Sequence, residues 1–507
     1  MEKRLFLAIA LALLVLLSWS AFVPKAYHID KQQVTYKSPT PIASQPIPSE
    51  LSQSTLAEPE ASSLFKFSQE KYDLVFSESQ AAIKEVIFKS YQNYIFPLKY
   101  GFLLGNANLV FQKENITPES AKFVCRDKDK QIIKRFVFSK SNYSISLEVE
   151  VQNLSTQPLR INLPLIVGVL GSNVDPNQVR FQDVTLVDKE KPMHLNPRKD
   201  ATLREVKFVG LRDRYFCAIV EPVVGNYTGF IHKVTLKESE VGLNPEEFTL
   251  NPGQQMQQKF DIYLGPQELR QINAIKPEWT EVMYYGKFNN FIAHLLLQLL
   301  DFIYGLVHNW GATIVILSLL IYFILYPLTL KQMRSMKQMQ ALQPRIEELR
   351  KIYKDNPQKL NTEIMGLYRE YKVNPFSGCL PLLLQMPIFF ALYQVLMRSV
   401  ALKGARFLWI KDLSEPDKLF SLPFGLPKPY DSFNLLPILM AIGMFIQQKF
   451  SMATASTGSA EQQKFMMILF PLMFGFIFYS MPSGLVLYWF VNSMLMLLYQ
   501  LRVNRQK

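Results

Sequence analysis

The chain has 507 residues, of which 49% are hydrophobic and 19% charged, and its formal net charge is +13. This composition excludes a collagen-like or wholly disordered chain, and three cysteines are too few for a disulfide-stapled scaffold. The mean hydropathy of +0.05 is typical of a soluble protein. An average conceals segregation, however, and apolar and charged residues are strongly segregated along this chain.

The N-terminus is a candidate membrane segment. Lys3 and Arg4 precede an uncharged, apolar stretch at 5–23, and a helix of about 19 residues reaches across a hydrocarbon core of about 30 Å. A cleavable signal peptide is the alternative, but the length of the stretch and Trp19 near its end favour a signal-anchor over 1–23. In either case the two basic residues place the N-terminus in the cytoplasm.

A linker and a β domain follow. Residues 24–63 are rich in Pro, Ser, Gln and Thr and poor in large apolar residues, which predicts an extended linker. Residues 64–280 contain short stretches that alternate apolar and polar positions, such as Ser144–Val151 and Leu159–Leu165, separated by Gly, Pro and Asn turns. This pattern predicts a β-sandwich of many strands, with Pro164 at a strand end or on an edge strand.

The β domain contains no motif of an enzyme. Its histidines, His194 and His232, stand in no catalytic or metal-ligand spacing, and the domain lacks a nucleophile elbow and a phosphate-binding loop. We therefore expect a binding or spacer domain with no catalytic residue, metal or cofactor. Cys125 and Cys217 either form a disulfide in an oxidising compartment or remain buried thiols, and the sequence leaves both possibilities open.

The last 220 or so residues are predominantly apolar. An amphipathic pattern at 284–307 predicts a helix lying in the membrane interface. The uncharged stretch at 465–501 would form a helix of about 55 Å, too long for one span, so Met481–Gly484 must divide it. With the first segment, six transmembrane helices are predicted, and the five in this half lie at 311–330, 377–398, 432–449, 465–480 and 485–501.

The distribution of basic residues predicts the orientation. Residues 331–376 hold ten Lys and Arg against five Asp and Glu, whereas the loop at 399–431 holds five against four. Since basic residues accumulate on the cytoplasmic side, 331–376 is cytoplasmic and 399–431 periplasmic. The loop at 450–464 and the short basic tail at 502–507 are then cytoplasmic. Both termini lie inside, and the β domain lies in the periplasm.

The segment 331–376 is predicted to form a helical hairpin. Apolar residues recur at helical spacing on both sides of a turn at Asp355–Pro357, and Pro344 predicts a kink in the first arm. We expect the two arms to pack on each other. The methionines of the first arm would also suit an adaptable apolar surface, and the basic face could bind ribosomal RNA or anionic lipid, although charged faces are usually just solvated.

Three stretches resemble segments of one family. Tyr326–Arg350, Tyr371–Leu396 and Pro482–Ser493 are similar to the cytoplasmic hairpin and two later helices of the YidC/Oxa/Alb membrane protein insertases. A large exported domain resembles the Gram-negative form, in which that domain is a periplasmic β-supersandwich. The resemblance implies a multi-pass insertase and chaperone of the cell inner membrane that takes part in protein transport and translocation. The resemblance also implies that the protein is not an enzyme and has no cofactor.

The resemblance also implies partners and sites. The partners are nascent membrane proteins, the Sec translocon, the lipid bilayer and, weakly through the hairpin, the ribosome; no direct DNA binding is expected. A polar groove in the membrane would receive the client. Its predicted residues are Tyr322, Gln385, Met386, Phe389, Gln394, Gln447, Tyr488 and Asn492. The predicted contact residues of the hairpin are Met333, Met336, Met339, Arg345 and Arg350.

One position departs from the family pattern. Tyr322 stands where the family usually has an arginine, and 311–330 contains no charge. Attraction of an acidic client to a buried cation is therefore not expected here, and Tyr322 offers a hydroxyl instead. The alternative functions are a transporter or channel with a periplasmic binding domain, and a membrane-anchored carbohydrate-active enzyme. The chain shows neither the intramembrane carboxylates nor the internal repeats common in transporters.

Overall fold

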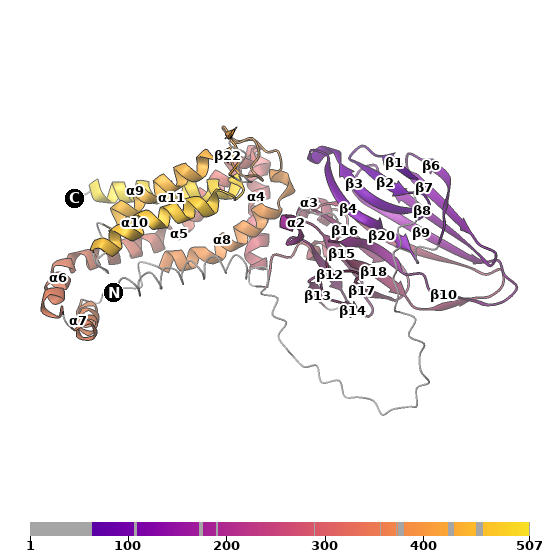
Figure 1. The fold of residues 1–507 in the computed structure, drawn as a ribbon, viewed down its shortest axis with the longest axis horizontal. Coiled ribbons are helices and arrows are strands. Elements are labelled where there is room, and N and C mark those ends of the chain that lie inside the picture. Colours follow the sequence, from indigo (N-terminus) through magenta and orange to yellow (C-terminus); the bar gives the residue numbers. More distant parts are fainter. Residues whose placement is uncertain are drawn as a thin grey trace, which may run out of the picture.

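The computed structural model describes residues 63–105, 109–171, 176–188, 191–287, 289–354, 356–371, 373, 380–423, 430–452 and 460–505. The predicted signal-anchor at 1–23 and nearly all of the linker lie outside the described residues. The described chain has two parts, a β domain and a group of long helices (Figure 1).

A nine-stranded antiparallel sheet forms one layer of the β domain. Its long central strands follow the predicted alternation: in β9, Ile145, Leu147, Val149 and Val151 are buried and the residues between them are half-buried. In spatial order the strands are β13 (Pro192–Leu195), β12 (Asp183–Val187), β15 (Phe208–Arg212), β16 (Phe216–Pro222), β20 (Gln255–Pro266), β9 (Ser144–Asn153), β8 (Lys130–Phe138), β7 (Ser120–Arg126) and β6 (Gln112–Thr117).

Two smaller sheets cover this layer. One contains β1 (Leu64–Ser68), β2 (Tyr72–Ser77), β3 (Ala82–Phe88) and β4 (Tyr94–Gly101) in that order. The other contains β14 (Ala201–Leu203), β17 (Tyr227–Lys233), β18 (Ser239–Pro245), β11 (Leu165–Leu170) and β5 (Leu103–Leu104). The pair β10 (Leu159–Ile161) and β19 (Phe248–Leu250) completes the domain. The predicted β-sandwich is therefore confirmed, and Pro164 lies between two strands, as its missing N–H requires.

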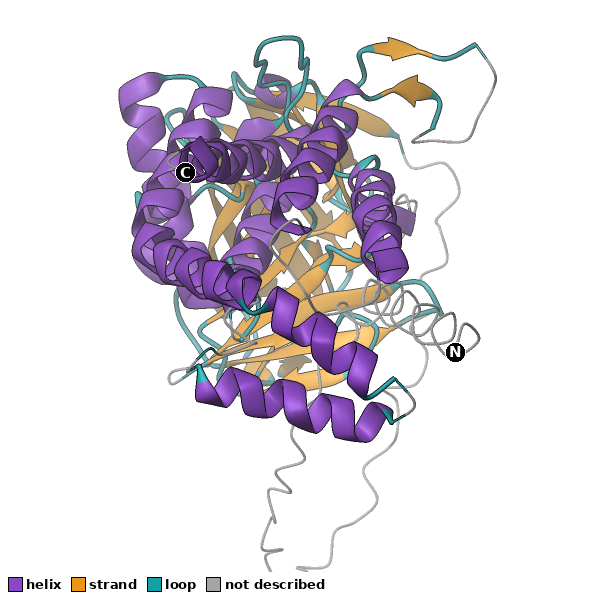
Figure 2. Cartoon of the chain, turned by 90° about the vertical axis from the view of Figure 1, so that its left-hand side faces the viewer, coloured by secondary structure: helices purple, strands orange, loops and turns teal. Residues whose placement is uncertain are grey.

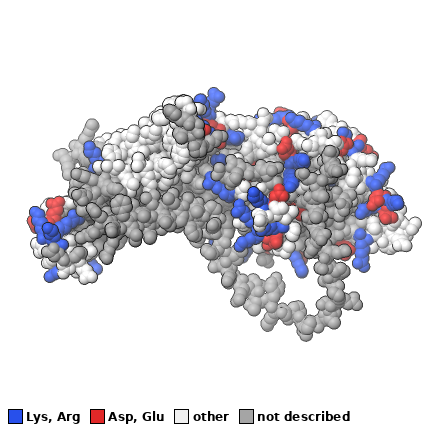
Figure 3. All heavy atoms as spheres, viewed as in Figure 1, with Lys and Arg blue, Asp and Glu red and all other residues white. Residues whose placement is uncertain are grey.

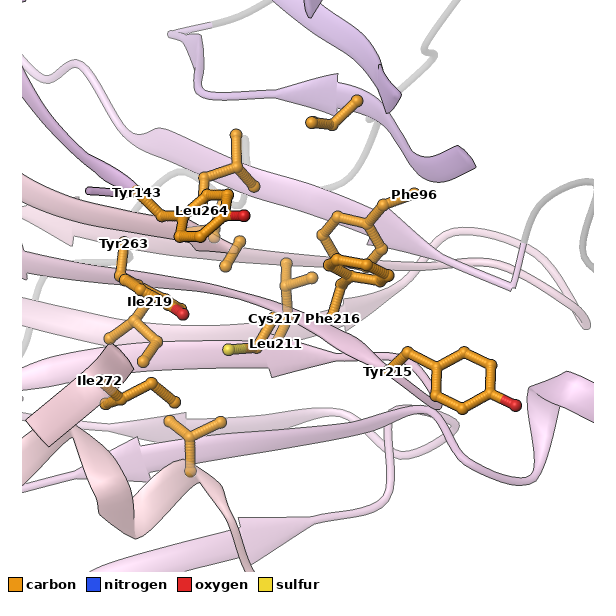
Figure 4. Packing of buried hydrophobic residues seen from close by; sticks show 14 of the residues in the cluster. Phe96, Tyr143, Leu211, Tyr215, Phe216, Cys217, Ile219, Tyr263, Leu264 and Ile272 are labelled. Carbon is orange, nitrogen blue, oxygen red and sulfur yellow. The ribbon is translucent and has the colours of Figure 1, made fainter. Parts of the chain in front are cut away.

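Aromatic side chains fill the space between the layers. Phe88 of β3 stacks on Phe216 of β16 with ring centroids 3.9 Å apart, and Phe76 of β2 meets Phe123 of β7 at 5.6 Å. Figure 4 shows Phe216 beside Phe96 and Cys217 within this core. Such rings bury large apolar areas, which is the main stabilisation of a two-layer sandwich.

The two cysteines of the domain do not pair. Cys125 lies on β7 and Cys217 on β16, and three strands of the sheet separate them. At about 4.8 Å per strand their backbones are about 19 Å apart, far beyond the reach of a disulfide. Both are buried free thiols. Of the two possibilities that the sequence left open, the structure selects the second.

The helical part begins with α3 (Leu269–Asn273) and a short 3₁₀ turn at Pro277–Val282. The long helices are α4 (Asn290–Val307), α5 (Trp310–Ala341), α6 (Gln343–Ile352), α7 (Pro357–Glu370), α8 (Leu380–Arg398), α9 (Leu435–Met452), α10 (Ala460–Phe478) and α11 (Ser483–Arg505). A small ribbon of β21 (Phe420–Ser421) and β22 (Ser432–Phe433) lies in the loop before α9. Figure 2 views these helices end-on from the side of α6 and α7.

Three of the described helices have the length and apolar composition of a membrane span: 290–307, 310–330 and 483–502. Two of them match predicted spans. The third is α4, for which the sequence predicted a position in the membrane interface; it has the length and apolar composition of a span, and its interfacial position stays a prediction. Leu435–Lys449 and Met467–Phe478 are shorter apolar helices. The described helices thus include three candidate membrane spans, and they do not establish the six that were predicted.

Several boundaries differ from the prediction. The predicted span at 311–330 and the start of the first hairpin arm form one continuous helix that runs to Ala341, because 331–341 contains good helix formers and the first proline after it is Pro344. The helix expected at 465 begins at Ala460, and the one expected at 432 begins at Leu435. The reason at the latter is local: Ser432 and Phe433 pair with the preceding strand.

Candidate functional site

A polar contact joins α8 and α11 inside the apolar helices. The side-chain amide of Gln385 donates a hydrogen bond to the hydroxyl of Tyr488, which is 1% exposed. One turn further along α11, Asn492 donates to the carbonyl oxygen of Tyr488 at 2.9 Å. The structure thus brings three of the predicted groove residues together. Tyr488 lies within the packing between the two helices and not on an open surface.

An aromatic cluster surrounds Phe389, one helical turn after Gln385. Its ring meets Trp489 of α11 at 5.0 Å and Phe478 of α10 at 6.3 Å, both between ring centroids. Phe474 of α10 also stacks on Trp489, with ring centroids 5.6 Å apart. Phe389 itself and Met386 are half-buried. Sequence analysis missed Trp489, although its position next to Tyr488 puts it on an adjacent face of α11.

Tyr322 belongs to a second aromatic group, on α5 and the end of α11. Its ring lies 6.1 Å from that of Tyr326, which in turn lies 5.7 Å from Tyr499. Tyr499 was not predicted, but it follows Tyr488 by 11 residues, close to three full turns, and therefore shares its face of α11. A row of hydroxyl-bearing side chains thus occupies the position for which the family pattern has a cation.

The remaining predicted groove residues stand apart. Gln394 on α8 and Gln447 on α9 are half-buried, and the contacts among described residues link neither of them to Gln385 or Tyr488. Other polar side chains donate hydrogen bonds to backbone carbonyls of their own helix. The hydroxyl of Ser318, for example, donates to the carbonyl oxygen of Ile314 at 2.7 Å. Such bonds remove polarity from a helix surface instead of adding it.

The hairpin at 331–376 has a small core of its own. The buried members of this core are Met339, Leu342, Ile346, Tyr368 and Val373. Met339 therefore holds the arms together and is not presented to a partner, contrary to the prediction. The side chains of Met333 and Met336 lie outside the described set.

The turn and the basic residues of the hairpin are well defined. The side chain of Asn356 caps α7 by accepting from the backbone N–H of Lys359 at 3.1 Å. Arg345, a predicted contact residue, bonds the hydroxyl of Tyr371 and lies 5.1 Å from the centre of its ring. Arg350 is half-buried. Of the predicted basic contacts, Arg345 is thus already engaged within the hairpin.

Charged side chains gather at the two ends of the molecule (Figure 3). One group covers the hairpin of α6 and α7, and another covers the β domain, while the described surface of the helices between them is largely uncharged in this view. Such a band is typical of a surface that faces lipid. Among the described residues, no group of three or more His, Cys, Asp or Glu side chains is placed to hold a metal ion.

An open pocket lies next to β16 in the β domain. Its lining residues are Glu205, Val206, Lys207, Glu221, Pro222, Gly225 and Asn226. The charges there are paired within the protein: Lys207 bonds Glu278, and Glu221 accepts from the indole N–H of Trp279 at 2.6 Å and lies 3.2 Å from Lys276. The pocket thus offers no unpaired pair of carboxylates of the kind that glycoside hydrolysis requires.

An uncharged helical band with a separate β domain defines an integral membrane protein, and comparison with known proteins identifies its class. Residues 302–507 match the family described as 60Kd inner membrane protein, and residues 112–299 match the YidC periplasmic domain. The membrane protein insertase YidC of Pelobacter propionicus is 31% identical, with 100% of this chain and 99% of that protein covered. The corresponding insertase of Syntrophobacter fumaroxidans is 36% identical over 74% of this chain and 68% of its own length.

The chain therefore belongs to the YidC family of membrane protein insertases. Among solved structures, a crystal structure of an active YidC insertase with its first transmembrane domain resolved is 20% identical, with a TM-score of 0.42. The match covers 86% of this chain and 92% of the chain in that crystal structure.

Proposed function

We propose that this protein helps nascent membrane proteins to insert, fold and assemble in the inner membrane. The observation that carries the proposal is the polar contact between Gln385 and Tyr488, which lies among apolar helices and next to the aromatic cluster of Phe389. A polar client segment that crosses bare hydrocarbon faces a barrier of several kcal/mol. A path lined by amides and hydroxyls lowers that barrier, and an apolar client helix then leaves sideways because burial in lipid stabilises it.

In the closed state of this path, the contact between α8 and α11 is intact. An interhelical hydrogen bond within a membrane is worth about 0.6 kcal/mol. A hydroxyl or amide of the client can therefore replace the bond at little cost, and α8 can separate from α11 as the client enters. Gln394 and Gln447 would hydrate the path on either side, and Met386 supplies a flexible apolar contact. No bond is made or broken in this process.

The topology is part of the proposal. The six spans, including the segment at 1–23 and the one at 377–398, place both termini in the cytoplasm and the β domain in the periplasm. The basic excess of 331–376 supports this orientation, as does the lack of charge in the helical band of Figure 3. In this arrangement α4 lies at the periplasmic surface beside the β domain. The Sec translocon is a partner for clients with large exported regions.

A ribosome contact would involve the hairpin. Exposed basic residues at Arg334, Lys351, Lys354 and Lys359 remain on its surface. Their attraction to RNA weakens steeply with salt, since each contact releases counterions. We therefore propose a weak contact.

Photo-crosslinking tests the proposed path. With a crosslinking amino acid at Tyr322 or Met386, a stalled nascent membrane helix should be captured. The control is Phe323, adjacent to Tyr322 in sequence but 68% exposed on the outer face of α5, which should capture lipid alone. Because Tyr488 is buried, a crosslinker there should capture the client only if α8 has moved away from α11.

Depletion of the protein should also stall the insertion of small inner-membrane proteins with short exported regions. If all three positions captured only lipid while a solute gradient depended on the protein, the transporter alternative would be correct.

A further inference from the structure

Two arginines join the C-terminal end of α8 to the β domain. Arg214 of the β domain contacts α8, and Arg398 of α8 contacts the β domain. Arg214, in the turn between β15 and β16, donates from Nε to the carbonyl oxygen of Met397 at 2.8 Å and approaches that of Ser414 at 3.3 Å. The last four carbonyls of a helix have no partner within the helix, and a cation there complements the negative end of its dipole. The β domain thus caps a membrane helix.

Arg398, the last residue of α8, reaches into the β domain. It is 8% exposed, donates to the carbonyl oxygen of Phe181 at 3.1 Å and lies 3.4 Å from a carboxylate oxygen of Asp183. The guanidinium groups of Arg214 and Arg398 lie 5.3 and 5.5 Å from the centre of the Phe181 ring. We call Arg214, Arg398, Phe181 and Asp183 the arginine junction.

The junction is buried, and its parts depend on one another. Asp183 is 7% exposed and also accepts from Arg212, so the two cations share its carboxylate. Removal of one partner from a buried ion pair leaves an uncompensated charge, which is far more costly than the loss of a surface pair. A Lys cannot replace the planar guanidinium fully, because it neither forks between two acceptors nor stacks on a ring in the same way.

The segment that leads out of the β domain, with α3 and Met283, also holds α4, the helix against which α8 packs. Arg270 of α3 donates to the carbonyl of Asp301 at 2.7 Å, and His294 lies 3.1 Å from the carbonyl of Met283. In contrast, α9, α10 and α11 pack chiefly on each other and on α5. Helix α8 therefore has two sets of contacts. The β domain supports its C-terminal end, and Gln385 and Phe389 connect it to the helical bundle.

We infer that Arg214 and Arg398 are positioning residues for the client path: they set the place of α8, and through it that of Gln385, Met386 and Phe389. Gln385 lies about 20 Å along the helix from Arg398, so a tilt at the junction moves the groove side of α8. Pro387 lies between the two and removes one helical hydrogen bond, which makes α8 easier to bend there. This inference rests on the proposed function.

The test compares client capture from two walls of the path in the full-length protein. Crosslinkers are placed at Met386 on α8 and at Tyr322 on α5, each combined with Arg398→Gln or Arg214→Gln. The capture at Met386 relative to Tyr322 should fall at least threefold in both variants, since only α8 loses its support. Arg398→Lys should recover part of this ratio. The exposed Arg406, in the loop after α8, provides the control Arg406→Gln, which should leave the ratio unchanged.

The possible outcomes distinguish a failure of the positioning role from a failure of the proposed function. A parallel fall at both positions would mean general destabilisation and would overturn the positioning role, as would an unchanged ratio in both glutamine variants. Absence of client capture from either position in the unaltered protein would instead refute the proposed function. Thermal unfolding of each variant in detergent shows whether the β domain is still folded, and Arg214→Gln provides a second, independent break if Arg398→Gln fails to fold.

Discussion

His194 is half-buried where the β domain meets the segment leading to α4. Its ring stacks on that of Tyr284, 3.8 Å between centroids, and its Nδ1 lies 3.1 Å from the hydroxyl of Thr185. Burial lowers the pKa of His194 from 6.5 to about 4, and nearby Arg212 acts in the same direction. The folded protein therefore holds this imidazole in its neutral form.

The lowered pKa of His194 predicts a pH-dependent stability. Between pH 4 and 6.5 the unfolded chain binds the proton and the folded chain does not, so the contribution of His194 is complete above pH 6.5 and is lost as the pH falls toward 4. His194→Gln should make the thermal unfolding midpoint less sensitive to pH over this interval, as followed by circular dichroism. His232→Gln, on an exposed side chain, is the control. Identical pH profiles for His194→Gln and the unaltered protein would contradict the assignment.

Lys134 shows how a single residue can join two sheets. Its ammonium group donates to the carbonyl oxygen of Ala81 at 2.7 Å and to that of Phe102, and burial lowers its pKa to about 7. A buried amine is tolerated because these backbone acceptors compensate part of its lost hydration. The sequence alone showed one lysine among many in an alternating strand.

At the level of elements, the start of α5 is in close contact with the loop that follows α8. A Cβ atom at Gly311 would lie 2.0 Å from Cγ of Phe407, so only glycine fits. The atoms it would meet belong to the root of an aromatic ring, which cannot move aside as a flexible chain end can. The tight contact fixes the loop at 399–423 to the end of a membrane helix.

Gly311→Ala should therefore destabilise the protein by about 1–3 kcal/mol, because one added methyl group overpacks this contact. Thermal unfolding in detergent measures the loss. Phe407→Ala in combination should restore part of it by removing the ring. Gly366→Ala on α7 is the matched control: its Cβ meets nothing within 4 Å, and alanine favours the helix by up to about 1 kcal/mol. Equal effects of the two glycine substitutions would contradict the packing argument.

At the scale of the whole molecule, charge is sorted by position along the long axis. The formal charge of +13 is unevenly spread, and 331–376 alone contributes ten basic against five acidic residues. The hairpin and the β domain occupy opposite ends of the molecule, with the helices between them (Figure 1). In the proposed orientation the basic excess of the hairpin lies on the cytoplasmic side, as expected of a topology signal.

This sorting predicts which sites are accessible from the periplasm. In a variant whose three cysteines are alanine, Lys128→Cys in the β domain should react with a membrane-impermeant maleimide in intact spheroplasts. Lys351→Cys in the hairpin should react only after lysis. Both lysines are exposed, so burial does not protect either site. Labelling of Lys351→Cys before lysis would refute the proposed orientation.

The sequence by itself determined that a β-sandwich domain is followed by a part made of long apolar helices. Uncharged runs, period-two alternation and basic bias are properties of neighbouring residues, and they predict a membrane helix, a sandwich strand and a cytoplasmic loop from local physics. They did not place the end of every element: α9 begins at Leu435 and not at 432, because Ser432 and Phe433 pair with the preceding strand.

Only the tertiary structure decided which side chains meet. Gln385 and Tyr488 are 103 residues apart, and Arg398 and Asp183 are 215 apart. No local pattern encodes such pairs, because they depend on how whole elements pack. The same reason explains why Met339 was expected on a surface and lies in a core, and why Arg214 and Arg398 remained unnoticed until the β domain was placed beside α8.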